Sequence, residues 1–423
     1  MSYLNLTYLP PVKRKEDSKS LPLLKTVDLF CGAGGITEGF KMAGFHCLYG
    51  NDIMKEAIDT FIYNNPHSLA DNRPIEHVDP QKIRKKLGLD KGDLDVLVGG
   101  PPCQGFSINA PDRFLEDPRN KLFKHYAKFL AEFQPKAFVF ENVPGLLSLG
   151  NGAIFEQILQ EFSKLGYKLS AKIMFAAHYG VPQERWRLIL LGSQDGCLSH
   201  PEPTHWAKGR ANFRGGRNMI FQLLDLDKGR LDPMVTVKDA IIDLPRLEMG
   251  EGAEEVGYTT DACSTYARLL RNPNGVTYNH YAAKLSRQNM ERMNHVPPGG
   301  SWRDIPLELL PKGMQRARRS DHTKRYGRLD PDTLSGTVLT KCDPHWGTVF
   351  LPDQNRALTV REAARFQSFP DAFRFLGSRV SQYEQVGNAV PVLMAKAIAM
   401  TIRRHLCAGN ITDNTIQKAA HHV

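Results

Sequence analysis

The chain of 423 residues lacks any long apolar segment. No uninterrupted apolar run approaches the roughly 20 residues that a membrane-spanning helix requires, which argues against an integral membrane protein. The first twenty residues, MSYLNLTYLPPVKRKEDSKS, lack the apolar centre of a secretion signal. Hydrophobic residues nevertheless make up 41% of the chain, enough for the cores of one large and one smaller domain. We therefore expect a globular protein that stays inside the cell.

Cysteine is sparse. The seven cysteines form no C-x-x-C pair and no regular framework, and they stand at positions 31, 47, 103, 197, 263, 342 and 407. This spacing argues against a disulfide scaffold and against a zinc site, so we expect no metal. Internal repeats and low-complexity tracts are also missing, which argues against a solenoid. A reduced thiol is therefore available for chemistry.

Acidic residues are outnumbered by basic ones. The formal net charge of +10 and the isoelectric point near 9.2 favour a polyanionic partner, because binding of Lys and Arg to phosphates releases counterions. Part of the excess lies in two clusters, Lys208 to Arg217 and Arg316 to Arg325. The clusters indicate a basic groove, although solvated surface runs have the same composition. Charge alone leaves nucleic-acid binding open.

Strands and helical stretches alternate from about residue 23 to residue 195. This alternation predicts a doubly wound α/β domain with a parallel sheet, and its strands are expected at 26–30, 47–50, 95–98, 136–140 and 187–191. From about residue 200 to 375 the rhythm disappears, and short β-prone pieces such as 336–339 and 346–351 take over. We therefore expect a second, irregular domain inserted before a C-terminal segment that regains α/β character.

The segment DVLVGGPPCQGFS, residues 95–107, presents a cysteine just beyond a strand. The apolar run Val96 to Val98 ends at two glycines, and Pro101 and Pro102 restrict the backbone before Cys103. In open α/β sheets the reactive crevice lies outside the carboxyl ends of the strands. A free cysteine is more often a buried structural residue. The stiff flanks favour a nucleophile here.

A glycine-rich turn, CGAGG at 31–35, follows the first predicted strand and brings backbone close to a ligand at a helix N-terminus. It lacks the full G-x-G-x-x-G spacing, and Glu38 would repel a pyrophosphate. A nucleoside cofactor without phosphates fits better. Asp52 is placed to accept hydrogen bonds from ribose hydroxyls and Asp79 from an adenine amino group. For either acid taken alone, a surface turn or a helix cap is the more common role.

Six motifs follow one another in order: DLFCGAGG at 28–35, GGPPCQGFS at 99–107, ENV at 141–143, QERWR at 183–187, RALTVREAARFQSFP at 356–370 and GNAVP at 387–391. Together they make the chain resemble the DNA cytosine-5 methyltransferases. The match spans nearly the whole chain outside the leader, the region from about 200 to 325 and the tail. The resemblance implies a Rossmann-like S-adenosylmethionine-dependent methyltransferase fold with a smaller inserted target-recognition domain.

The implied domains are a polar leader (1–22), a catalytic cofactor-binding domain (23–195), the target-recognition domain (196–379) and a C-terminal segment (380–423) that returns to the catalytic domain. The resemblance also implies S-adenosyl-L-methionine as cofactor, with Asp52 on the ribose and Asp79 near the adenine. The implied cofactor-binding residues are Phe30, Gly32, Gly34, Asp52, Asp79, Pro101 and Asn388. Family members often carry a further acid after the ribose carboxylate, where this chain has Met54 and Lys55.

The implied chemistry begins with addition of the Cys103 thiolate to carbon 6 of cytosine, which makes carbon 5 nucleophilic. Glu141 would donate a proton to the ring nitrogen N3, because apolar neighbours raise the pKa of a carboxyl group; alone, it could be a capping or salt-bridging acid. Arg185 and Arg187 alternate at a strand start and can orient the base and favour its negative charge. A stacked base hides its ring faces, so base flipping is implied. Residues 104–119 are expected to close over the DNA as a mobile loop.

We expect an enzyme that methylates carbon 5 of cytosine within a short sequence of double-stranded DNA. An RNA (tRNA) cytosine-5 methyltransferase is the alternative within the same class, but about 130 residues between QERWR and Arg328 favour a domain that reads a groove. A non-catalytic DNA-binding homologue is the alternative from another class. Long regulatory regions are missing, which favours a monomeric bacterial enzyme of the restriction-modification or solitary type. It would be cytoplasmic and nucleoid-associated, with no membrane partner and, in a restriction-modification system, with a cognate restriction endonuclease.

Overall fold

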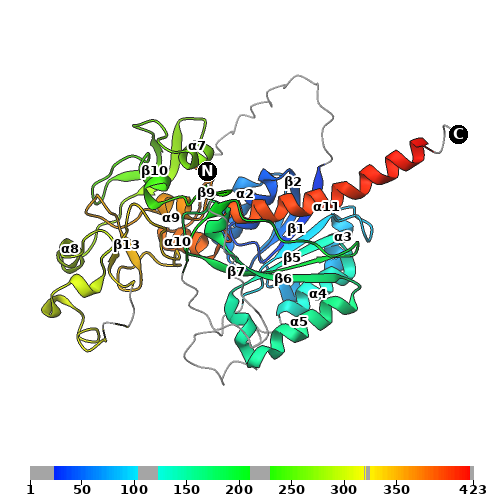
Figure 1. Cartoon of the computed structure of the whole chain (residues 1–423), viewed down its shortest axis with the longest axis horizontal. Coiled ribbons are helices and arrows are strands. Elements are labelled where there is room, and N and C mark those ends of the chain that lie inside the picture. Colours follow the sequence, from blue (N-terminus) through cyan, green and yellow to red (C-terminus); the bar gives the residue numbers. More distant parts are fainter. Residues whose placement is uncertain (1–22, 103–121, 210–228, 319, 321–323, 420–423) are drawn as a thin grey trace, which may run out of the picture.

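A seven-stranded sheet forms the centre of the protein in the computed structural model, which describes residues 23–102, 122–209, 229–318, 320 and 324–419 (Figure 1). Its strands are β1 (Leu24–Leu29), β2 (Phe45–Asn51), β3 (Leu69–Asp71), β4 (Val96–Gly99), β5 (Ala137–Asn142), β6 (Lys168–Phe175) and β7 (Trp186–Ser193). They are ordered β3-β2-β1-β4-β5-β7-β6. The pairs from β3 to β5 are parallel, and β7 runs antiparallel to both β5 and β6.

Helices cover both faces of the sheet (Figure 1). They are α1 (Gly35–Met42), α2 (Lys55–Asn64), α3 (Pro80–Lys86), α4 (Leu122–Phe133), α5 (Ala153–Lys164) and α11 (Val392–Ala419). Leu97 of β4 belongs to a core with the aromatic side chains of α4 and α5. Its neighbours Val96 and Val98 belong to a second core with residues of α1 and α11. Because successive side chains of a strand point to opposite faces, an unbroken apolar strand feeds two cores at once.

The strand order places a topological switch point between β1 and β4. From β1 the chain proceeds outward to β2 and β3, whereas β4 leads to β5 on the other side. Loops that leave the carboxyl ends of such neighbouring strands part in opposite directions and open a crevice. The doubly wound α/β fold predicted from the sequence is confirmed, including all five predicted strands of the sheet. The other two strands, β3 and β6, are not among those five.

Beyond β7 the chain forms short elements grouped to one side of the sheet (Figure 1). The strands are β8 (His205–Trp206), β9 (Asp232–Pro233), β10 (Gly252–Gly257), β11 (Val276–Tyr281), β12 (Gly327–Arg328) and β13 (Thr348–Phe350), and the helices are α6 (Val237–Ile241), α7 (Thr265–Leu270), α8 (Arg287–Asn294), α9 (Val360–Phe366) and α10 (Arg379–Asn388). The predicted β-prone piece 346–351 contains β13. The other piece, 336–339, is not a strand.

Residues 336–339 stay irregular because their hydrogen bonds go to the QERWR segment. The backbone N–H of Val338 donates to the side-chain Oε1 of Gln183 at 3.0 Å. The N–H of Glu184 donates to the carbonyl of Ser335 at 2.9 Å. The domain boundaries predicted from the sequence remain predictions, but these contacts bring the irregular region directly against the start of β7.

A fully buried ion network anchors α9 to the irregular region. Arg365 pairs with Asp371 at 2.6 Å and with Asp243 at 3.1 Å, and the hydroxyl of Tyr258 donates to Asp371 at 2.6 Å. Removing one partner of such a network leaves an uncompensated buried charge, which typically costs about 3–5 kcal/mol. The network therefore fixes the orientation of α9. Among the described residues, no single helix is both long and apolar enough to span a membrane, although α10 and the first part of α11 reach those limits as a bent pair.

Candidate active site

A cavity of about 550 Å³ opens at the carboxyl ends of β1, β2, β4 and β5. Residues that follow these four strands line it on one side, and residues of α10 line it on the other. This is the crevice expected at a topological switch point. Eight of the residues predicted from the sequence meet there: Phe30, Gly32, Asp52, Pro101, Glu141, Arg185, Arg187 and Asn388.

The turn after β1 needs left-handed backbone conformations. Phe30, Gly32 and Gly34 have φ angles of 58°, 53° and 102°, a region that glycine enters without strain. A Cβ on Gly32 would meet no atom within 4 Å, so the turn leaves open space beside its backbone. Gly34 does not line the cavity. It is instead the residue before α1 and packs closely against Phe61.

Asp52 supports that turn from the end of β2. Its Oδ2 accepts a hydrogen bond from the N–H of Gly32 at 2.9 Å, and its Oδ1 accepts one from the N–H of Met54 at 2.9 Å. Burial raises the pKa of this carboxyl group, and the backbone donors oppose the rise. Each carboxylate oxygen has further acceptor capacity, so Asp52 can also accept from ribose hydroxyls in the cavity.

The structure does not bring Asp79 into the cavity. Asp79 is exposed and caps α3, accepting hydrogen bonds from the N–H groups of Gln81 at 2.9 Å and Lys82 at 3.3 Å. The helix-cap alternative describes what is seen, and the signal was in the sequence: Pro80 occupies the first helical position, where proline is favoured. Among the described residues, Glu76 lines the cavity in its place.

Glu141 forms a tight pair with Arg187 on the cavity wall. The Nε of Arg187 lies 2.7 Å from Oε1 of Glu141, and both side chains are 13% exposed. Burial raises the pKa of Glu141, while the cationic Arg187 and Arg185 oppose that rise. The other oxygen, Oε2, would lie 2.6 Å from a Cβ on Gly100, so the carboxyl group fits only because residue 100 lacks a side chain.

Asn142 connects β5 to the loop that precedes Cys103. Its Nδ2 donates to the carbonyl of Pro101 at 3.1 Å, and its Oδ1 accepts from the N–H of Val143 at 2.9 Å. Pro101 and Pro102 both line the cavity. Cys103 itself and the predicted loop 104–119 lie outside the described residues. Pro102, on the cavity wall, is therefore the last described residue before the predicted nucleophile.

Arg185 and Arg187 both line the cavity, but their guanidinium groups have different partners. Arg185 is 2% exposed, and its terminal nitrogen donates to the carbonyls of Gly387 and Ala389, each at 2.8 Å. Trp186 stacks on Phe175 with ring centroids 4.3 Å apart. Arg185 thus joins the QERWR and GNAVP segments, whereas Arg187 holds the carboxyl group of Glu141.

Several residues that line the cavity were not predicted from the sequence. Ile53 is 69% exposed although apolar, and Ile75 lines the same cavity, so the two provide apolar surface beside Asp52. Glu384 and Gln385 line it from α10, just before Asn388. Ile53 directly follows Asp52, the acid at the end of β2, and this position could have predicted that it lines the cavity. The contribution of Ile75 depends on the path of the chain after β3, which no local pattern fixes.

The chain matches a family model described as C-5 cytosine-specific DNA methylase over residues 24–404. It is 36% identical over 430 residues to the type II methyltransferase M.AgeI of Thalassovita gelatinovora, covering 90% of this chain and 99% of that protein. It is 36% identical to the type II methyltransferase M1.HphI of Haemophilus parahaemolyticus, covering 90% and 86%.

Solved structures show the same fold. A DNA modification methyltransferase encoded within a prophage (E. coli) matches with a TM-score of 0.68 at 25% identity, over 90% of this chain and 99% of that one. DNMT2 of Spodoptera frugiperda matches with a TM-score of 0.55 at 17% identity, over 90% and 99%. The family model covers most of the chain, and residues of five of the six motifs line the cavity. The chain therefore belongs to the C-5 cytosine-specific DNA methylases, enzymes that transfer a methyl group from S-adenosylmethionine to carbon 5 of cytosine in DNA.

Proposed function

We propose that Cys103 is the nucleophile of this methyltransferase and that Glu141, Arg185 and Arg187 form the rest of its catalytic centre. The observation that carries the proposal is the Glu141–Arg187 pair, which lies on the same cavity wall as Pro101 and Pro102, immediately before Cys103. A thiolate presented there can add to carbon 6 of a cytosine whose N3 faces Glu141. Carbon 5 then becomes electron-rich enough to accept a methyl group. Loss of the C5 proton afterwards expels the Cys103 sulfur from carbon 6 and restores the ring.

Glu141 has the electrostatic setting of a proton donor to N3. Burial favours its neutral form, and Arg187 fixes the direction of one carboxyl oxygen. As negative charge builds on the ring, the guanidinium of Arg187 can stabilise it from a desolvated position. Arg185 acts as a positioning residue, because its Nη2 donates to the backbone carbonyls of Gly387 and Ala389.

The residues of the other half of the cavity fit S-adenosylmethionine. Ile53 and Ile75 offer apolar surface for an adenine ring, and Asp52 offers acceptors for ribose hydroxyls. We assign the carboxylate of Glu76, rather than that of Asp79, to the adenine side. Gly32 and Asn388 complete the wall. When bound, the cofactor supplies the activated methyl group.

The substrate proposed here is a short sequence of double-stranded DNA, which the region 196–379 would read. Two relatives at 36% identity are type II methyltransferases by name, which supports the DNA substrate over the RNA alternative. We further propose that the enzyme acts as a monomer in the bacterial cytoplasm, associated with the nucleoid, and that a restriction endonuclease of the same specificity accompanies it.

Expression in a host free of cytosine methylation, followed by genome-wide mapping of 5-methylcytosine, tests this function. The expected result is methylation confined to one short sequence, with none in cells that express Cys103→Ser. Digestion of RNA from the same cells to nucleosides tests the alternative substrate. Methylcytosine in RNA but not in DNA would contradict the proposal.

A further inference from the structure

An exposed aromatic and basic surface packs through Leu339 against Gly387, a residue that lines the catalytic cavity. We call it the Trp346 edge, and it consists of Lys324, Arg325, Leu339, Lys341 and Trp346. Trp346 is 56% exposed and Leu339 is 39% exposed, while Lys324 and Lys341 are also exposed. An exposed indole within a group of cations is unusual for a surface that contacts only water.

Backbone contacts bind the Trp346 edge to the cavity wall. The carbonyl of Val338 accepts from Arg185 at 3.5 Å, and a Cβ on Gly387 would come within 2.5 Å of the carbonyl oxygen of Leu339. A Cβ on Gly347 would lie 2.9 Å from Cδ1 of Leu339. The chain of contacts therefore runs from two cavity-lining residues through Leu339 to the neighbour of Trp346.

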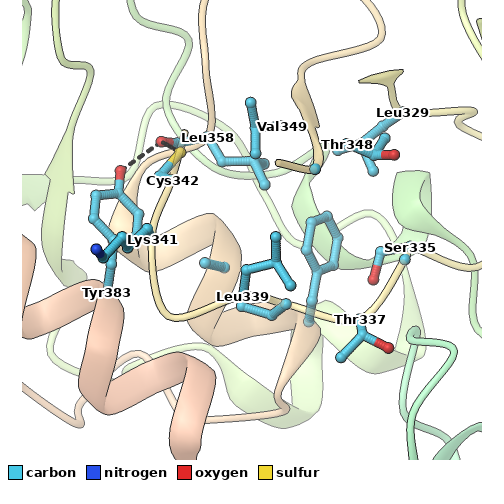
Figure 2. A pocket seen from close by; sticks show the side chains of 15 residues that line it. Leu329, Ser335, Thr337, Leu339, Lys341, Cys342, Thr348, Val349, Leu358 and Tyr383 are labelled. Carbon is cyan, nitrogen blue, oxygen red and sulfur yellow. Dashed lines mark hydrogen bonds between the residues drawn. The ribbon is translucent and has the colours of Figure 1, made fainter. Parts of the chain in front are cut away.

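The segment that carries Leu339 and Lys341 packs around a small crevice. The crevice there has a volume of about 30 Å³, enough for about one water molecule. Figure 2 shows Leu339, Val349 and Leu358 around it, with the hydroxyl of Tyr383 donating to the carbonyl of Leu358 at 2.6 Å. This crevice is too small for a ligand. The side chains packed around it support the Trp346 edge.

Hydrogen bonds hold the turn that carries Trp346. The N–H of Trp346 donates to the carbonyl of Asp343 at 3.0 Å, and the N–H of Tyr326 donates to the carbonyl of Pro344 at 2.6 Å. The imidazole of His345 lies between the hydroxyl of Tyr326 at 3.1 Å and a guanidinium nitrogen of Arg325 at 3.3 Å. These hydrogen bonds hold the backbone of the turn from which the indole projects.

Arg325 covers one face of the indole. Its Cζ lies 4.6 Å from the centroid of the Trp346 ring, a distance typical of a cation–π contact. Lys324 is tied to Glu184 at 2.6 Å, next to Arg185 in the chain. An aromatic ring with a guanidinium on it, beside a basic edge, has the chemistry that stacks on a nucleic-acid base and accepts a phosphate nearby.

We propose that the Trp346 edge contacts duplex DNA beside the extruded cytosine, and that the indole of Trp346 stacks on a base left exposed by the extrusion. This inference rests on the proposed function, which requires the target base to leave the duplex. Extrusion breaks stacking on both sides of the target. An exposed aromatic ring beside the cavity can replace part of that lost stacking, and Arg325 and Lys341 add attraction to the phosphates.

Tryptophan fluorescence can test the contact directly. Among the four tryptophans of the chain, Trp346 is exposed, whereas Trp186 and Trp206 are half-buried and Trp302 is buried. Addition of a duplex that carries the mapped target sequence should quench the emission and protect it from acrylamide. The Trp346→Phe variant should bind the same duplex and lose most of that response. An equal response in Trp346→Phe would overturn the inference.

Affinity measurements give an independent readout. Trp346→Ala should bind the target duplex on the order of tenfold more weakly, with Trp346→Phe close to wild type and S-adenosylmethionine affinity unchanged. Met400→Ala truncates a side chain of α11 that is 42% exposed and should change neither affinity. If wild type methylates DNA and Trp346→Ala binds it equally well, this inference fails alone. If wild type methylates no DNA, the proposed function fails as well.

Discussion

The Nε of Arg187 lies 2.7 Å from Oε1 of Glu141, on the wall of a cavity where burial raises the pKa of that carboxyl group. Burial and the neighbouring Arg187 have opposing effects on the pKa of Glu141. Burial favours retention of the carboxyl proton, which in the proposed mechanism goes to N3 of cytosine, and Arg187 limits how strongly that proton is retained. The following predictions depend on this balance and on the residues around it.

Substitution of Glu141 by Gln should lower the single-turnover rate of methylation by about 10²–10⁴-fold, the range typical of general acid catalysis. The wild-type rate should fall as the pH rises through the pKa of Glu141, because the proton donor is lost. The Gln variant should lack that falling limb. A rate profile that starts near pH 4.5, the ordinary pKa of a glutamate, and extends to alkaline pH checks both, with Glu161→Gln, a partly exposed acid, as control. An unchanged rate in Glu141→Gln would remove this residue from the mechanism.

Substitution of Arg187 by Met should shift the falling limb of the rate profile to higher pH. Loss of the neighbouring cation raises the pKa of a buried carboxyl group further, so Glu141 keeps its proton over a wider range. The maximal rate should also drop, since the ring charge loses its guanidinium. The same pH series measures both effects. A limb displaced to lower pH would mean that another group controls it.

Substitution of Gly100 by Ala should greatly reduce turnover without unfolding the protein. The added Cβ would lie 2.6 Å from Oε2 of Glu141, so the carboxyl group must move. Gly145→Ala is the matched control, because a Cβ there meets no atom within 4 Å. Circular dichroism and single-turnover kinetics on both variants test this. Equal rates would show that the position of Glu141 has more tolerance than the structure allows.

Substitution of Glu76 and of Asp79 by Ala should affect different properties, S-adenosylmethionine affinity for Glu76 and stability for Asp79. Glu76→Ala should weaken S-adenosylmethionine binding by roughly tenfold and leave the melting temperature nearly unchanged, because a hydrogen bond to a charged acceptor is worth about 1.5–3 kcal/mol. Asp79→Ala should cost about 1 kcal/mol of stability through loss of the helix cap and keep the affinity. Isothermal titration and thermal melts distinguish them. The reverse pattern would restore the assignment made from the sequence.

Asp28 should make the folded protein less stable as the pH rises from about 4 to 7. It is 0% exposed, and burial raises its pKa to about 7. In this window the unfolded chain has released the proton and the folded chain retains it, so the free energy of unfolding falls by about 1.4 kcal/mol per pH unit. Asp28→Asn should therefore gain stability over wild type at pH 8 but not at pH 4.

Denaturant unfolding at these two pH values measures the difference. The hydroxyl of Thr37, which donates to Asp28 at 2.6 Å, keeps an acceptor in the Asn variant. Asp59→Asn, at an exposed ion pair with Lys55, is the control and should show no such pH dependence. A gain in Asp28→Asn that is the same at both pH values would argue that Asp28 does not titrate in this range.

The sheet and most of the cavity could be predicted from the sequence, because their signals are local. Apolar runs such as Val96 to Val98 mark buried strands, and the residues just after a strand end at the same edge of a parallel sheet. This suffices to place Gly32, Asp52 and Glu141 together. The strand β6 escaped notice because its solvent-facing residues interrupt the apolar pattern.

Other parts depend on contacts between distant segments. Asp79 was misplaced because a helix cap and a ligand-binding acid look alike until the path of the chain is known. The Nη2 of Arg185 donates to carbonyls of residues about 200 positions away. No local spacing in the sequence indicates such a contact. The Trp346 edge likewise exists only because Arg325 folds against Trp346 and Leu339 packs against Gly387 of the GNAVP segment.

Covalent trapping on DNA that contains 5-fluorocytosine at the target position tests the central claim most directly. Fluorine cannot leave carbon 5 as a proton does, so the enzyme should stop as a stable adduct in the presence of S-adenosylmethionine. Peptide mass spectrometry should find the modified base on Cys103 and on none of the other six cysteines, and Cys103→Ser should form no adduct. Normal methylation of unmodified DNA with no adduct on the fluorinated duplex, or an adduct on a different cysteine, would contradict the account.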